Sequence, residues 1–191
     1  PIFCACVTAC RGMRSNMSKV LALMLAAGRG SRFGSDKRVA RLADGRSLLA
    51  ASVERAQQVF AEIYVLLRNE DDPQTLGLVA DCRTIRCAEA DQGMGHSLAA
   101  GICALADQDA DAIAVLLGDM PWISANSLQQ LCEQAAPERI VYPLYDGQRG
   151  HPVLFGRTFW PQLLNLSGDH GARELLHAHA AACQAVILAD S

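Results

Sequence analysis

The hydrophobic residues of this chain fall into short apolar runs, separated by longer stretches that carry apolar residues at helical spacing. Residues 20–25, 63–67 and 112–117 are apolar at nearly every position and have the length of a buried strand. Residues 47–60, 96–106 and 126–134 show the helical period. Near-continuous apolar strands that alternate with helices are typical of a mostly parallel sheet covered on both faces. The pattern therefore predicts a three-layer α/β fold.

The weaker segments extend the same alternation. We expect further strands at residues 83–85, 139–142, 152–155 and 185–188, short helices at 73–80 and 158–164, and a helix that runs through His177. A turn at residues 93–95 should precede the helix at 96–106. Ligands of such sheets bind beyond the carboxyl ends of the strands. The loops after residues 25 and 117 are therefore where we look for chemistry.

The first of these loops is rich in glycine and in positive charge. Residues 29–41 hold five of the chain's 17 basic residues and a single acidic one. Glycines allow a backbone to curl tightly and to point its N–H groups at an anion. The loop contains neither a Walker motif nor the G-x-G-x-x-G dinucleotide pattern. We interpret it as a phosphate site, and the alternative is a flexible basic surface loop.

The second loop carries a carboxylate, Asp119, directly after a predicted buried strand. A carboxylate in this position can hold Mg²⁺ through one oxygen while the phosphates of a substrate supply others. The alternative is that Asp119 serves only as a turn or cap residue, which is a frequent role for aspartate.

Composition narrows the class of protein. The chain has 191 residues, of which 51% are hydrophobic and 19% charged, and a formal net charge of -3. These values predict a folded core and argue against disorder and against a nucleic-acid coat. No apolar run approaches the roughly 20 residues of a membrane span. We expect one domain over residues 17–191, preceded by an N-terminal extension at 1–16 that takes no part in the fold.

The eight cysteines form no C-x-x-C pair, and most sit singly among apolar neighbours, as reduced core thiols do. This usage predicts a cytoplasmic protein. Cys4, Cys6 and Cys10 are close enough for a metal or redox cluster, but their spacing is unlike that of zinc sites.

Five motifs resemble, in the same order, those of the MobA-like nucleotidyltransferases, and most closely the molybdenum cofactor cytidylyltransferase branch. The first alone is shared with sugar-phosphate nucleotidyltransferases, whereas the five together are specific. They are Leu25-Ala-Ala-Gly-x-Gly-x-Arg32-x-Gly34-x-x-Lys37, Gly93-Met94-Gly95-His96-Ser97-Leu98, Gly118-Asp119-Met120-Pro121, Arg149-Gly150-His151-Pro152-Val153-Leu154-Phe155 and Gly168-Asp169-x-Gly171-Ala172-Arg173.

The resemblance implies a Rossmann-like fold of the nucleotide-diphospho-sugar transferase type. It implies Mg²⁺-dependent transfer of CMP from CTP to the terminal phosphate of molybdopterin, with release of pyrophosphate. The Ala26-Ala27-Gly28 form of the first motif is associated with CTP. Rival interpretations are a GTP-using molybdenum cofactor guanylyltransferase, a sugar-phosphate nucleotidyltransferase and a non-catalytic nucleotide-binding partner of a molybdenum enzyme. A molybdenum enzyme that receives the product would be a further partner; nucleic acid and membrane would not.

The resemblance also assigns roles to residues. The catalytic groups would be Arg32, Lys37 and Asp119. The metal would be held by Asp119 and Asp169. The acceptor would be bound by Arg149, His151, Asp169 and Arg173. The nucleotide would contact Leu25, Ala26, Ala27, Gly28, Arg29, Gly30, Ser31, Gly34, Gly93, Met94, Gly95 and Ser97.

Two of these motifs keep a second interpretation on the residues alone. Gly93 to His96 could simply begin a helix, with Ser97 near its cap. His151 could touch ligand or satisfy a local backbone group. We expect His96 to be a contact residue rather than a catalyst, because phosphoryl transfer from an anionic acceptor needs no proton shuttle.

Overall fold

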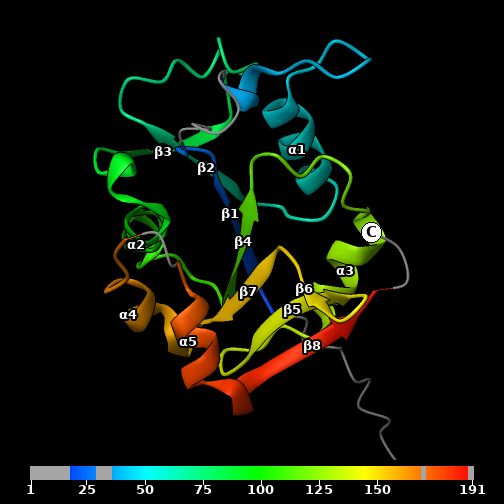
Figure 1. The fold of residues 1–191 in the computed structure, drawn as a ribbon, viewed down its shortest axis with the longest axis vertical. Coiled ribbons are helices and arrows are strands. Elements are labelled where there is room, and N and C mark those ends of the chain that lie inside the picture. The colour runs from blue at the N-terminus through cyan, green and yellow to red at the C-terminus, as the bar shows by residue number, and fades with distance from the viewer. Residues whose placement is uncertain (1–17, 29–35, 169–170, 189–191) are drawn as a thin grey trace, which may run out of the picture.

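The computed structural model describes residues 18–28, 36–168 and 171–188. An eight-stranded sheet crosses it, in the order β3-β2-β1-β4-β7-β5-β6, with β8 paired to β5 (Figure 1). The strands are β1 Val20–Leu25, β2 Ile63–Arg68, β3 Arg83–Cys87, β4 Ala112–Leu117, β5 Ile140–Tyr145, β6 Gln148–Arg149, β7 Val153–Gly156 and β8 Cys183–Ile187.

The sheet is mostly parallel, as predicted. β1 pairs in parallel with β2 and β4, β2 with β3, and β5 with β8. β7 and β6 form the antiparallel pairs. Leu25 and Leu117, the last residues of β1 and β4, are direct register partners. The two loops singled out in the sequence therefore leave the sheet at the same edge.

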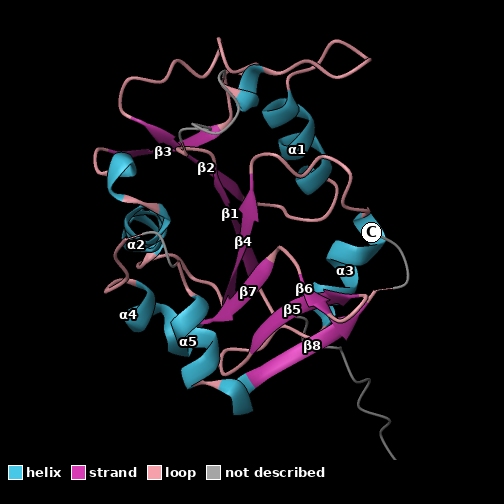
Figure 2. Ribbon diagram, in the orientation of Figure 1, coloured by secondary structure: helices cyan, strands magenta, loops and turns pink. Residues whose placement is uncertain are grey.

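Helices cover both faces of the sheet, which confirms the three layers (Figure 2). One face carries α2, α4 and α5, and the other α1 and α3. The α-helices are α1 Leu48–Gln57, α2 Met94–Leu105, α3 Ala125–Glu133, α4 Trp160–Leu163 and α5 Arg173–Ala178. Short 3-10 turns are η1 Lys37–Val39, η2 Ala90–Gln92, η3 Arg157–Phe159 and η4 Ala180–Ala182.

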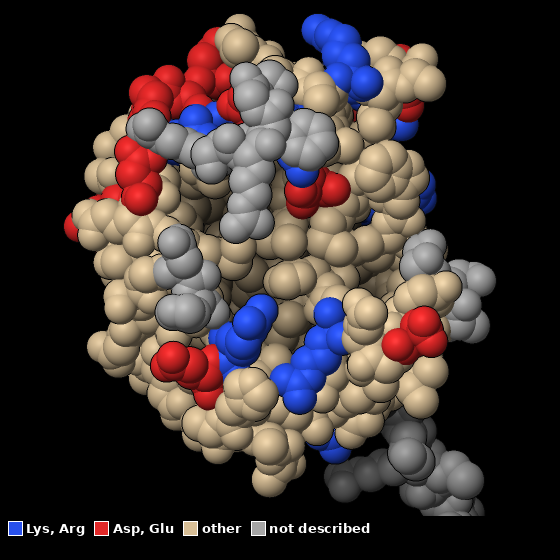
Figure 3. Space-filling model, in the orientation of Figure 1, with Lys and Arg blue, Asp and Glu red and all other residues tan. Residues whose placement is uncertain are grey.

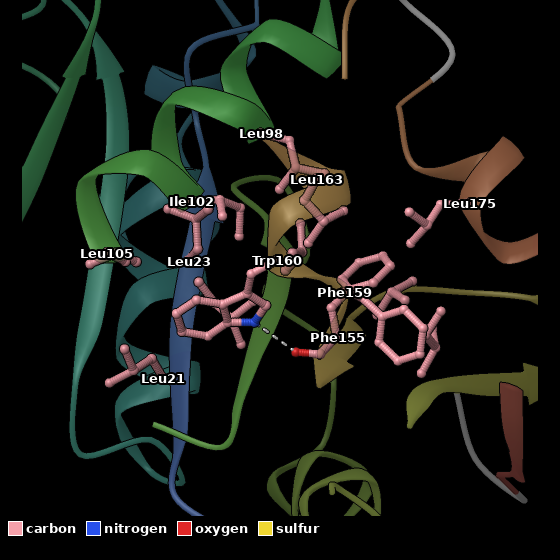
Figure 4. Close-up of a cluster of buried hydrophobic side chains, with 14 of the residues drawn as sticks. Leu21, Leu23, Leu98, Ile102, Leu105, Phe155, Phe159, Trp160, Leu163 and Leu175 are labelled. Carbon is pink, nitrogen blue, oxygen red and sulfur yellow. Dashed lines mark hydrogen bonds between the residues drawn. The ribbon is translucent and has the colours of Figure 1, made fainter. Parts of the chain in front are cut away.

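Two apolar clusters hold the layers together because successive strand residues point to opposite faces. Leu21 and Leu23 of β1 join the cluster under α2, α4 and α5, whereas Ala22 and Met24 join the one under α1 and α3. Figure 4 shows the first cluster, in which the buried Trp160 indole N–H donates to the backbone oxygen of Phe155 at 3.1 Å. This packing holds the central strands of the sheet, on which the candidate site is built.

Two local predictions were wrong. Residues 73–80 form hydrogen-bonded turns rather than a helix: the N–H of Gly77 donates to Gln74 and that of Leu78 to Pro73, which closes the segment after one turn. Gly77 takes a φ of 80°, where glycine has no steric penalty. The predicted turn at 93–95 is the start of α2, since only Gly93, with a φ of 114°, lies outside the helix.

No helix in the described ranges is both long and apolar enough to cross a membrane. The expectation for residues 1–16, and the cysteine cluster within it, lie outside the described residues.

Candidate active site

The ends of β1 and β4 bring the two candidate loops into contact. The Gly118 N–H donates to the Leu25 carbonyl at 3.1 Å, one residue beyond the last paired strand positions. A Cβ on Gly118 would lie 2.9 Å from Leu49 Cδ1 and 3.2 Å from the Ala26 side chain. Only glycine allows this approach without displacement of its neighbours. The backbone that follows Leu25 and the backbone that precedes Asp119 therefore form one continuous surface.

Asp119 faces outward from this surface. It is exposed, and its carboxylate accepts no hydrogen bond from the described residues. The preceding Gly118 carbonyl lies 3.2 Å from the hydroxyl of Ser52, a buried residue of α1. The following helix, α3, is capped by Ser124, whose Oγ accepts from the Ser127 N–H at 3.0 Å. Asp119 is thus a turn residue but not the cap, and its side chain is turned away from the core.

A buried arginine anchors the first loop. Arg38 is 7% exposed and lies between two carboxylates, Asp36 and Asp71. Its Nη1 and Nη2 donate to the two oxygens of Asp71 at 2.5 and 2.8 Å, and its Nε and Nη2 donate to Asp36 at 2.6 to 3.0 Å. Nη1 also donates to the Ala26 carbonyl at 2.7 Å. One guanidinium, on η1, therefore joins the loop after β1, the residue before η1 and the turn after β2.

A second arginine holds the next two carbonyls of the same loop. Arg68, the last residue of β2, donates from Nε to the Ala27 carbonyl at 2.9 Å and from Nη2 to the Gly28 carbonyl at 2.6 Å. Three successive backbone oxygens are thus bound by guanidinium groups. Their partial negative charge is offset there, so it no longer opposes an anion placed against this loop.

Arg38 keeps the carboxylates of Asp36 and Asp71 ionised. Hydrogen bonds from Arg38 hold the pKa of Asp36 below its usual range. Burial alone would raise the pKa of Asp71, but the hydrogen bonds from Arg38 and from the Arg68 backbone outweigh it and the pKa is lowered. Burial likewise disfavours the charged form of Arg38, but the two carboxylates raise its pKa. The cluster is fully ionised at neutral pH.

Of the predicted phosphate-binding residues, the structure places Leu25 to Gly28 and Lys37. Gly28 is exposed at the sheet edge, and Lys37 begins η1, half-buried, between two members of the buried cluster. Arg29, Gly30, Ser31, Arg32 and Gly34 lie outside the described residues, so their roles remain predictions.

The predicted nucleotide residues at 93–97 form the first turn of α2, which agrees with the alternative of a helix start. The structure joins this turn to Gly168, on the predicted acceptor side. The Gly95 N–H donates to the Gly168 carbonyl at 2.8 Å, and the Gly168 N–H lies 3.2 Å from His96 Nδ1. Ser97 is buried, whereas Met94 is 45% exposed. The second and fifth motifs, far apart in the sequence, are therefore in direct contact.

Figure 3 shows a hollow in this face of the molecule, and basic side chains lie beside it, over α5 and over β5 and β6. The described basic residues of these elements are Arg173, which begins α5, and Arg149 in β6. Both are exposed, and the Arg149 guanidinium stacks on the ring of Tyr142, 4.9 Å from its centroid.

His151 lies near Asp119. Burial lowers the pKa of His151, although the Asp119 charge acts in the opposite direction. At neutral pH the imidazole is therefore uncharged, so it does not offset the negative charge of the Asp119 carboxylate. Asp169 lies outside the described residues, so the predicted pair of metal-binding carboxylates stays a prediction.

The residues present fit a magnesium ion that is shared with a substrate. Within residues 18–28, 36–168 and 171–188, no group of three or more His, Cys, Asp or Glu side chains could cage a metal. Mg²⁺ is commonly held by one or two carboxylates together with waters and substrate phosphates. The single outward carboxylate of Asp119, at the edge where Gly28 emerges, matches that mode of binding.

Sequence reasoning missed Arg38, Arg68 and Asp71. Arg38 was counted among the basic residues of the first loop, but its charge is neutralised by the carboxylates of Asp36 and Asp71. Asp71 is 33 positions away from it in the chain, and no motif links the two. The only signal in the sequence was the short spacing of Asp36 and Arg38.

Comparisons with known proteins identify the family of the chain. The model of the MobA-like NTP transferase domain matches residues 22–183. A 101-residue stretch, 53% of the chain, is 35% identical to "Purine catabolism protein PucB" of Bacillus subtilis. The match spans about half the length of that relative, 49%.

Among solved structures, Rv0371c from Mycobacterium tuberculosis is 23% identical, with a TM-score of 0.79 over 90% of this chain and 88% of that one. A complex of Rv0371c with manganese aligns with a TM-score of 0.73 and 23% identity, over 90% of this chain and 89% of that one. These likenesses show the fold, and the domain model shows the family: this chain belongs to the MobA-like NTP transferases.

Proposed function

We propose that the protein is a Mg²⁺-dependent nucleotidyltransferase that transfers CMP from CTP to the terminal phosphate of molybdopterin and releases pyrophosphate. The observation that carries the proposal is the contact between the loop after β1 and the loop after β4. It joins the backbone at Leu25, three residues before the exposed Gly28, to the backbone at Gly118, directly before Asp119. The carbonyls from Ala26 to Gly28 are bound by Arg38 and Arg68 and so repel a phosphate less. Family membership supports the general reaction, and the motif variant Ala26-Ala27-Gly28 supports CTP.

The reaction needs positioning and charge more than proton transfer. An oxygen of the acceptor phosphate attacks the α-phosphorus of CTP in line, the new P–O bond forms, and the bond to the bridging oxygen of the β-phosphate breaks. The acceptor oxygen is already anionic, so no general base is required. The electron pair leaves with pyrophosphate, whose charge Lys37 and Arg32 would offset. The work of the protein is to hold two anions together and to stabilise the charge that spreads between them.

Asp119, together with Asp169, would hold the metal, which would offset phosphate charge and weaken the repulsion between the two reacting anions. The manganese complex of Rv0371c supports a divalent ion in this fold. The preceding Gly118 carbonyl is packed beside Ser52 of α1, so the position of Asp119 is set by the core rather than by a mobile side chain.

The hollow of Figure 3 would take the acceptor. Arg149 and Arg173 are exposed on the elements beside it and can offset phosphate charge. The stacking of Arg149 on Tyr142 orients its guanidinium at little entropic cost. His151, uncharged and half-buried, would donate or accept a hydrogen bond rather than supply charge.

The test is a pyrophosphate-release assay with each of the four nucleoside triphosphates, with Mg²⁺, and with molybdopterin present or absent. We expect release with CTP only when molybdopterin is present. Release with GTP would make the protein a guanylyltransferase, and release with a sugar 1-phosphate in place of molybdopterin would place it with the sugar-phosphate enzymes.

Measuring whether CTP binds distinguishes an enzyme from a non-catalytic nucleotide-binding partner. A nucleotide at 100 times its dissociation constant should stabilise the fold by about 2.7 kcal/mol. Stabilisation by CTP without any release of pyrophosphate would contradict the proposed reaction and favour a maturation partner of a molybdenum enzyme.

A further inference from the structure

We propose that His96 is a positioning residue for transfer: together with Gly95 it clamps Gly168 and so holds the acceptor-side connection between α4 and α5 against the nucleotide-side turn of α2. The inference rests on the proposed function for what the two sides bind. The clamp itself rests on contacts between described residues.

The clamp involves both backbone polar groups of Gly168, its carbonyl and its N–H. The Gly168 carbonyl accepts from the Gly95 N–H at 2.8 Å, and the Gly168 N–H lies 3.2 Å from His96 Nδ1. Gly168 has a φ of 66°, in the left-handed region that favours glycine. Two neighbouring residues of α2 thus fix both the position and the orientation of this backbone.

The contact with Gly168 requires one particular tautomer of His96. A backbone N–H can only donate, so Nδ1 must be the unprotonated acceptor in this contact and Nε2 carries the hydrogen. The Gln92 carbonyl also lies 3.0 Å from Nδ1, and it would bind this nitrogen only in the tautomer that releases Gly168. The side chain that best replaces His96 is therefore one with an acceptor near the Nδ1 position.

The first turn of α2 lies close to the connection between α4 and α5 at residues 167–168 and again at residue 171. A Cβ on Gly95 would lie 2.7 Å from the Ser167 oxygen and 2.9 Å from the Gly168 oxygen. Beyond it, Gly171 is buried, and a Cβ there would lie 3.6 Å from the Met94 sulfur. The first turn of α2 therefore packs closely against Ser167 and Gly168, and its Met94 lies near Gly171, just before Arg173 begins α5.

His96 is not needed to build α2. The helix is anchored by Leu98, Ile102 and Leu105, which are at most 3% exposed, whereas His96 is half-buried at its first turn. Loss of the imidazole should free the connection and leave the helix and sheet intact. The site would then bind nucleotide normally but would hold Arg173, and with it the acceptor, less firmly.

Steady-state kinetics with Mg²⁺, CTP and molybdopterin test the inference in a set of matched variants. His96→Ala and His96→Gln should raise the KM for molybdopterin about 3- to 10-fold, the equivalent of one hydrogen bond, with kcat and the KM for CTP unchanged. His96→Asn should keep wild-type KM, because its amide presents an oxygen near the Nδ1 position. Gly95→Ala should also raise the KM for molybdopterin and, because Gly95 is a predicted nucleotide contact as well, it should raise the KM for CTP. His177→Ala, an exposed histidine on α5, is the control.

Hydrogen–deuterium exchange gives a readout that requires no activity. Exchange of peptides that span residues 166–176 should accelerate in His96→Ala and His96→Gln but not in His96→Asn, while the rest of α2 keeps its protection. Equal exchange in all variants, or equal kinetics in His96→Ala and wild type, would overturn the clamp. If wild type transfers no nucleotide at all, the proposed function fails, and the exchange pattern alone decides the clamp.

Discussion

Replacement of Asp71 by asparagine tests the buried charge cluster that anchors the first loop. The side chains of Asp71 and Arg38 are 7% and 9% exposed, and two hydrogen bonds of 2.5 and 2.8 Å join them. Asparagine keeps the shape and one acceptor oxygen, but it removes the charge and turns an amide N–H₂ toward a guanidinium. Asp36, with its side chain 34% exposed, remains to offset part of the Arg38 charge.

The expected loss of stability is about 3 kcal/mol. Breaking a buried ion pair by removal of one partner costs roughly 3 to 5 kcal/mol, because the other charge stays buried. The remaining carboxylate of Asp36 places this case at the lower end. For a protein of this size, a loss of this magnitude lowers the melting temperature by about 6 to 12 °C.

Thermal and urea unfolding at pH 7 measure this loss. The matched control is Asp44→Asn, which changes the same residue type in an ion pair with Arg46 that is 46% and 45% exposed. Exposed ion pairs contribute little to stability, so this variant should unfold at the same temperature as wild type. A loss in Asp71→Asn no larger than in Asp44→Asn would refute the argument that burial makes the Arg38 cluster important.

The same variant tests the link to function, because Arg38 also holds the Ala26 carbonyl. Below its melting range, Asp71→Asn should show weaker stabilisation by CTP and slower transfer. Full activity in a clearly destabilised protein would mean that the cluster supports the fold without shaping the phosphate site.

Four further predictions concern the same edge of the sheet. In the folded protein the pKa values of Asp36 and Asp71 lie below their ordinary 3.8, so the stability that these carboxylates contribute is complete above that pH and is lost as the pH falls through the lowered values. When unfolding is measured at decreasing pH, the free energy of unfolding should therefore fall less steeply in Asp71→Asn than in wild type. Lys37→Ala should lower turnover about 100- to 1,000-fold in a protein that stays folded, and turnover within a few-fold of wild type would remove its role. Asp119→Asn should lose Mg²⁺-dependent turnover, and an unchanged metal titration would reject it as a ligand. Gly118→Ala, whose Cβ would meet a side-chain carbon at 2.9 Å, should cost about 1 to 3 kcal/mol in urea unfolding and slow transfer, whereas wild-type stability would contradict the close approach.

The sheet could be predicted from the sequence because its strands are buried on both faces. β1, β2 and β4 are apolar at nearly every position, which leaves no other place for them than the centre of an α/β fold. Their shared parallel direction then placed the two candidate loops at one edge. This part of the site could therefore be predicted from the spacing of apolar residues and the order of the elements along the chain.

The ends of the elements were less predictable because single hydrogen bonds decide them. Residues 73–80 looked helical by composition, but Asp72 and Gly77 close a single turn from either side. Conversely, α2 begins at Met94, earlier than expected, because Gly93 supplies a backbone angle that ends the preceding turn. Neither outcome changes the spacing of apolar residues.

The charge cluster could not be predicted because its partners come from separate elements. Asp36 precedes η1 and Asp71 follows β2, and only the parallel pairing of β1 with β2 brings them to the same guanidinium. The clamp on Gly168 has the same character, since it joins motifs that lie 72 positions apart. Contacts of this kind are consequences of topology.

The cluster also changes how the basic loop should be understood. A count of five basic residues at 29–41 predicts a strong local positive field. In the structure, two carboxylates neutralise Arg38, and Arg41 is exposed and donates to the Gly45 carbonyl at 2.6 Å. Part of the apparent field is thus used to shape the backbone. Because Arg38 is neutralised by Asp36 and Asp71, the net positive field at this loop is weaker than the count of basic residues indicates, and the ordered backbone of residues 26–28 has to contribute more of the attraction for a phosphate.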